Sequence, residues 1–82
     1  MSLAHATVPP MRLFERQDGR YYLISDPRFD LLGDLVVETR RGSRYSRLGG
    51  SKTYVGSDPF DLDRVIARIV NARIRHGYVE NQ

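Results

Sequence analysis

One stretch of the chain, residues 40–56, gathers positive charge and contains no acidic residue. Its five cations are Arg40, Arg41, Arg44, Arg47 and Lys52. The whole chain has a formal charge of only +3, so the charge is concentrated in this stretch. Tyr45 and Tyr54 lie among the cations. Because cations neutralise phosphates and aromatic rings stack on bases or sugars, this composition is typical of a surface that binds nucleic acid without reading its sequence.

A solvated loop would have a similar composition, because surface arginines also keep a small domain in solution. No motif that reads a base sequence accompanies the cations. Two interpretations of this stretch therefore stay open, a soluble loop without a ligand and a nucleic-acid surface. The residues of that surface would be Arg40, Arg41, Arg44, Tyr45, Arg47 and Lys52.

The residues that usually carry catalysis or bind metals are sparse. The chain has no cysteine, which removes a thiol nucleophile and the commonest zinc sites. Of its two histidines, His5 lies in the N-terminal segment and His76 at the expected end of a helix, where the helix dipole favours a cation. Asp58, Asp61 and Asp63 gather where that helix should begin, and helix capping accounts for them. No glycine-rich nucleotide motif is present. We expect no enzymatic activity, no metal and no cofactor.

Length and composition bound the fold. The chain's 82 residues suffice for one small domain. With 40% hydrophobic and 28% charged residues, wholesale disorder is not expected. No apolar run approaches the roughly 18 residues that a membrane helix needs, and the start of the chain does not resemble a signal peptide. We expect a cytoplasmic protein without a membrane partner, with residues 1–10 as a disordered tail and residues 11–80 as the folded domain.

Four segments are rich in β-forming residues or alternate between apolar and polar residues, which predicts strands at 11–16, 20–25, 35–41 and 51–55. The Asp-Gly pair at 18–19 predicts a type I′ hairpin turn between the first two strands. Residues 28–33 follow neither a strand nor a helix period. We expect them to form a loop whose Phe29, Leu31 and Leu32 fold back onto the core.

After residue 58 the apolar spacing changes from two to three or four, which predicts an amphipathic helix over about 62–76. Asp61 is the expected N-cap, and Gly77 stands where a left-handed C-cap residue is expected. Arg73 lies at the margin of the apolar stripe, where its stem can cover core atoms. With the strands, this helix predicts an α+β domain, a four-stranded antiparallel sheet with one C-terminal helix packed on one face.

The order of residues along the chain carries a further signal. Segments 20–24 and 30–37, the glycine-punctuated basic hairpin, the amphipathic helix and the closing segment 73–78 follow one another in a pattern that resembles a WGR domain. The resemblance spans residues 11–80, and the closing basic-x-x-x-Gly-Tyr is its most specific part. It implies a sheet of antiparallel strands with one helix packed on it. WGR domains occur in poly(ADP-ribose) polymerases, where they contact DNA ends and neighbouring domains, and in small bacterial proteins, which this chain resembles in size.

Two registers place the family's Trp-Gly-Arg motif. Residues 41–43, Arg-Gly-Ser, keep only the glycine, whereas residues 45–47, Tyr-Ser-Arg, keep an aromatic residue and the arginine. Because the tryptophan that would stack on a terminal nucleotide is absent, the resemblance implies a non-catalytic module with weak, sequence-tolerant nucleic-acid binding. The alternative is a protein–protein interaction or dimerisation module that does not bind nucleic acid.

Overall fold

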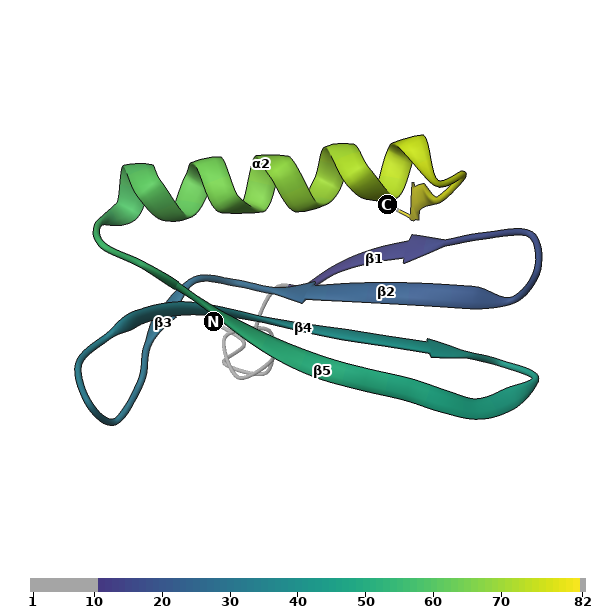
Figure 1. The fold of residues 1–82 in the computed structure, drawn as a ribbon, viewed down its shortest axis with the longest axis horizontal. Coiled ribbons are helices and arrows are strands. Elements are labelled where there is room, and N and C mark those ends of the chain that lie inside the picture. The colour runs from purple at the N-terminus through teal and green to yellow at the C-terminus, as the bar shows by residue number, and fades with distance from the viewer. Residues whose placement is uncertain (1–10, 82) are drawn as a thin grey trace, which may run out of the picture.

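The computed structural model describes residues 11–81, without the side chain of Leu48, and they form one helix and a six-stranded sheet (Figure 1). The strands are β1 (Met11–Glu15), β2 (Arg20–Ser25), β3 (Arg28–Phe29), β4 (Leu35–Ser43), β5 (Ser46–Gly56) and β6 (Val79–Asn81). The helix α2 spans Pro59–Arg75. The α+β class is confirmed. The sheet has six strands rather than the expected four, because the short β3 and β6 join the four that the sequence predicts.

All strand pairs in the sheet are antiparallel, and β4 organises them. One edge of β4 pairs with β5 along its whole length, and the other edge is shared by β2 and β3. β1 then pairs with β2, and β6 pairs with β1. The sheet therefore ends at the long strand β5 on one side and at the three-residue strand β6 on the other.

Helix α2 forms a second layer on one face of the sheet (Figure 1). Alternate strand residues point to this face, since side chains along a strand alternate between the two faces. The core between the layers contains Phe14, Tyr22, Ile24, Val37, Leu62, Ile69 and Tyr78. Full burial of one such side chain contributes about 1.5–3 kcal/mol, so this cluster is the main reason that α2 stays on the sheet.

The helix begins earlier than expected. Asp58 is the N-cap, and its carboxylate accepts a hydrogen bond of 2.8 Å from the Asp61 N–H. Pro59 occupies the first helical position, where no N–H is needed. The expected cap at Asp61 is therefore wrong: its carboxylate accepts the Ser57 N–H at 2.9 Å, and this bond is the main cause that lowers the pKa of Asp61. Gly77, with φ of +88°, follows the helix as expected.

The turn between β1 and β2 is not type I′. That turn needs a positive φ at both central residues, but Gly19 has φ of +88° while no non-glycine residue among 11–81 has a positive φ. The Gly19 N–H donates to the Arg16 carbonyl at 3.0 Å, and the Arg16 N–H donates to the Arg20 carbonyl at 2.9 Å. Residues 17–19 thus form a three-residue loop that ends in a left-handed glycine.

The segment that follows β2 projects from the domain instead of folding back on the core. The Asp30 carboxylate accepts the Leu32 and Asp34 N–H groups, each at 2.9 Å, and so shapes a tight turn between β3 and β4. This turn leaves Phe29 72% exposed, and Leu31 and Leu32 even more so. The expectation that these three side chains join the core is wrong, because pairing of β3 with β4 directs the turn away from α2.

Candidate nucleic-acid interface

The six candidate residues lie on β4, on β5 and on the turn between them, but strand alternation divides the cations between two faces. Arg41 is the register partner of Tyr22, and Lys52 that of Thr39. Paired residues share a face of the sheet, so Arg41 and Lys52 lie on the face that carries α2. Arg40 lies on the opposite face. The hairpin therefore presents two charged surfaces instead of one continuous platform.

Two of the hairpin cations have carboxylate partners. A side-chain ion pair joins Arg44 to Glu15 of β1, and the Nε of Arg40 lies 3.9 Å from a carboxylate oxygen of Glu38. Both arginines are more than half exposed, and exposed pairs of this kind contribute at most about 1 kcal/mol. Among residues 11–81, no ion pair involves the other three hairpin cations, Arg41, Arg47 and Lys52.

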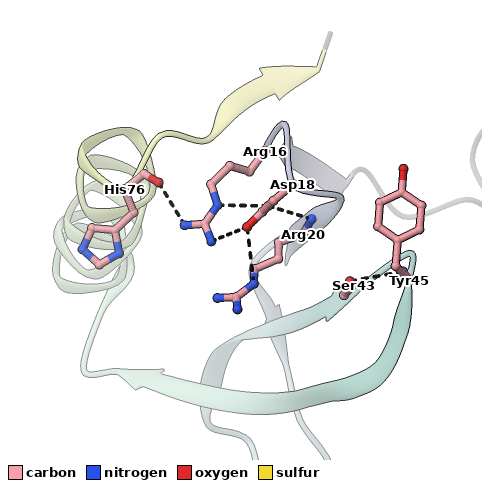
Figure 2. Close-up of polar contacts among 6 residues, drawn as sticks. All are labelled: Arg16, Asp18, Arg20, Ser43, Tyr45 and His76. Atoms are coloured by element: carbon pink, nitrogen blue, oxygen red, sulfur yellow. Dashed lines mark hydrogen bonds and ion pairs between the residues drawn. The ribbon is translucent and has the colours of Figure 1, made fainter.

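Tyr45 lies at the tip of the β4–β5 hairpin and is 81% exposed. Its N–H donates to the Ser43 hydroxyl at 3.2 Å, and its ring packs beside Gly19 in the neighbouring turn. The tips of two hairpins therefore meet here (Figure 2). A pocket of about 480 Å³ lies beside this contact, lined by residues that include Asp18, Arg20, Arg41, Ser43, Tyr45 and Gly49.

A second charged cluster ties the β1–β2 turn to the end of the helix (Figure 2). The Arg16 guanidinium donates to the Asp18 carboxylate at 2.7 Å and to the His76 carbonyl at 3.1 Å. The Arg20 Nε lies 3.6 Å from the same carboxylate. The hydrogen bond from Arg16 is the main cause that lowers the pKa of Asp18 to about 2. At neutral pH this acid is ionised and already balanced by two arginines.

The structure adds one residue that the sequence analysis did not assign to a site. The guanidinium of Arg73 lies 4.5 Å from the Tyr22 ring centroid, on the same side of the sheet as Arg41 and Lys52. The signal in the sequence is the position of Arg73 beside the apolar stripe of the helix, which predicts a stem that covers core atoms and does not predict a site. Periodicity shows that a cation borders the core, but not which charged groups meet it there.

Within residues 11–81, no group of three or more histidine, cysteine or acidic side chains is placed to hold a metal ion. No helix in the same range has the length and apolar character to cross a membrane. Comparison with protein-family models, with curated proteins and with solved structures finds no significant match.

Proposed function

We propose that this chain is a non-catalytic, WGR-like module that binds nucleic acid weakly and with little sequence preference through the β4–β5 hairpin. One observation carries the proposal. Arg41, Arg47 and Lys52 have no ion pair within residues 11–81, while the aromatic ring of Tyr45 is 81% exposed at the tip of the same hairpin. This combination supplies phosphate contacts and a stacking face without a group that selects a base.

The three unpaired cations are the primary phosphate contacts in this proposal, and Tyr45 is the stacking residue. Arg40 and Arg44 take a secondary part, because each must first leave its carboxylate. That exchange costs little, since exposed ion pairs contribute at most about 1 kcal/mol. The cations lie on both faces of the hairpin. A nucleic-acid strand that wraps around the hairpin is therefore favoured, in preference to a duplex groove that docks flat against one face.

The WGR assignment is part of the proposal. The single helix packed on an antiparallel sheet agrees with the fold that the resemblance implies. The register with Tyr45-Ser46-Arg47 on Trp-Gly-Arg puts the aromatic residue at the exposed hairpin tip. The other register puts the motif inside β4, where Gly42 is the register partner of Gly49. The first of these placements suits a stacking residue better, so we prefer it.

Fluorescence anisotropy with labelled single-stranded and duplex DNA at several salt concentrations tests the proposal. With three phosphates neutralised, the logarithm of the affinity for duplex DNA should fall with the logarithm of salt with a slope of about −2.7, since each phosphate contributes about 0.9. If all five hairpin cations engage, the slope steepens to about −4.5. Absence of micromolar binding at low salt contradicts the proposal.

Dimerisation is the second candidate function, and the edge of the sheet favours it. Strand β5 is 11 residues long and, among residues 11–81, pairs with β4 alone. Its outer backbone edge can accept another strand, and Val55 is 59% exposed there. Light scattering distinguishes the two functions. An interaction through the edge persists at high salt and in the double variant Arg41→Ala/Arg44→Ala, whereas nucleic-acid binding weakens in both cases.

A further inference from the structure

A pocket of about 370 Å³ lies where α2 approaches its end above β4 and β5. Its charged side chains are all cations: Arg41, Lys52 and Arg73. Four hydroxyl-bearing residues, Tyr22, Thr39, Ser51 and Tyr54, complete the polar lining, and no acidic residue lines it. Three positive charges that share one recess repel one another, so an anion bound among them would relieve that repulsion.

Arg73 lacks a hydrogen-bond acceptor that its surroundings should provide. Its Nε is buried and has no hydrogen-bond partner. The guanidinium is held in place by two rings, with Tyr22 at 4.5 Å and Tyr78 at 5.6 Å from its centre. A buried guanidinium N–H without an acceptor is unfavourable, and buried polar groups in native proteins are nearly always paired. Because the Nε is closed to solvent, an oxyanion in the pocket would supply the missing acceptor once the guanidinium turns its Nε–H toward the pocket.

Two further cations are positioned to contribute. The Lys52 ammonium lies 4.8 Å from the centre of the Tyr54 ring. Lys52 is therefore positioned over a tyrosine that lines the pocket. Burial is the main cause that raises the pKa of Tyr54, so its hydroxyl remains a donor at neutral pH. Arg73 and Arg41 act on that pKa in the opposite direction, as cations near a phenol do.

The negative end of the helix does not oppose an anion strongly at this position. Several of the last carbonyls already accept hydrogen bonds: the Tyr78 N–H donates to the Arg73 carbonyl at 3.0 Å, and the Gly77 N–H donates to the Ile74 carbonyl at 3.1 Å. The His76 carbonyl accepts the Arg16 guanidinium. Side-chain and backbone donors therefore satisfy these carbonyls, so they are not left as unpaired acceptors that would repel an anion.

We infer that this pocket binds a single phosphate group, either free or as a phosphate monoester, through Arg41, Lys52 and Arg73 with tyrosine hydroxyls as additional donors. Arginine guanidinium groups match the oxygens of phosphate in pairs, and a dianion balances three cations better than a carboxylate does. The inference rests on the pocket alone and does not require the chain to bind nucleic acid.

Titration with inorganic phosphate and with methyl phosphate tests the inference, followed by NMR at constant ionic strength set with chloride. We expect a saturable shift of the Arg73 Nε–H resonance, because that proton gains an acceptor. Arg73→Gln should weaken phosphate binding by about tenfold, the equivalent of one charged hydrogen bond. Lys52→Gln, at an exposed position, should weaken it similarly. The matched control is Arg75→Gln, which removes the same charge from the exposed side of α2 and should leave the affinity within about twofold.

Tighter binding of methyl phosphate than of inorganic phosphate identifies an ester as the ligand, and the reverse order identifies free phosphate. Both results support the pocket. The inference is overturned if no resonance shifts saturably up to about 10 mM phosphate, or if Arg75→Gln weakens binding as much as Lys52→Gln does. A failure of the DNA titration with intact phosphate binding removes the proposed function and leaves the pocket in place.

Discussion

The ring of Tyr45 packs against the backbone of Gly19, so that a Cβ atom added to Gly19 would lie 2.4 Å from the Cε2 atom of Tyr45. These residues belong to different hairpins. Their contact fixes the β4–β5 tip beside the β1–β2 turn, where the Arg44 N–H also donates to the Gly19 carbonyl at 3.0 Å. The exposed ring at the candidate interface is therefore held in position by a residue that carries no side chain.

Replacement of Gly19 with alanine tests this contact. Gly19→Ala should destabilise the fold in two ways, through a left-handed backbone that costs roughly 1–2 kcal/mol and through the clash with Tyr45. Gly33→Ala is the matched control, because Gly33 has φ of +85° and nothing within 4 Å of the added atom. Urea denaturation should show a larger loss of stability for Gly19→Ala, and equal losses would mean that Tyr45 does not hold this position.

The ion pair between Arg44 and Glu15 predicts that nucleic-acid binding becomes stronger when the carboxylate is removed. Glu15→Gln keeps the oxygen that accepts the Asn81 amide N–H at 2.9 Å but releases Arg44. One more free cation should steepen the salt slope on duplex DNA by about 0.9. Anisotropy titrations measure this change.

Glu80→Gln serves as the control for that experiment. It removes the same charge, but its partner is Arg12 at 2.7 Å and not a cation of the hairpin. We expect the slope of Glu80→Gln to match that of the unaltered protein. Equal steepening in both variants would show that net charge, and not the release of Arg44, is responsible.

The Asp18 cluster predicts a defined response to acid. The pKa of Asp18 is about 2 in the folded protein, compared with an ordinary value of 3.8. The ionised carboxylate therefore stabilises the fold above about pH 4. That contribution falls as the pH drops from about 4 toward about 2, because protonation of the carboxylate removes its pairing with Arg16. Asp18→Asn should lower the melting temperature at pH 7 and lose less stability over that acidic range. Asp63→Asn, at an exposed helix position, should leave the acid response unchanged.

The N-cap at Asp58 predicts an asymmetry between neighbouring aspartates. Asp58→Ala removes the acceptor of the Asp61 N–H and should lower the free energy of unfolding by about 1 kcal/mol. Asp63→Ala changes a nearby exposed acid that caps nothing and should have a smaller effect. Thermal denaturation followed by circular dichroism measures both. An equal loss in the two variants would mean that charge near the helix start matters and the specific cap does not.

Much of the fold follows from local sequence patterns. The alternating segments predict β1, β2, β4 and the second half of β5, which begins at Ser46 and not at the expected residue 51. The change of period predicts α2. Each element must bury one face that its own residues define. The sequence patterns do not predict the short strands β3 and β6. They have two and three residues, too few for a period to appear, and they form only because β4 and β1 offer them unpaired edges.

The candidate site was predictable to a lesser degree. Its cations and Tyr45 are visible as a run in the chain, and strand alternation divides the cations between two faces. The sequence does not show which side chains these residues contact in the folded domain. Glu15 reaches Arg44 and Tyr22 stacks on Arg73 across long sequence separations, and no local rule connects them.

The amino-acid sequence by itself determined the α+β class, the principal strands, the helix and the concentration of positive charge near residues 40–56, since all of these depend on residue type and spacing along the chain. Tertiary structure alone decided which cations are neutralised, that the turn after β2 projects outward, and that Arg41, Lys52 and Arg73 meet in one pocket. The physical reason is that electrostatic pairing and burial depend on distances in space, which the packing of α2 and the register of the sheet establish only when the whole domain has folded.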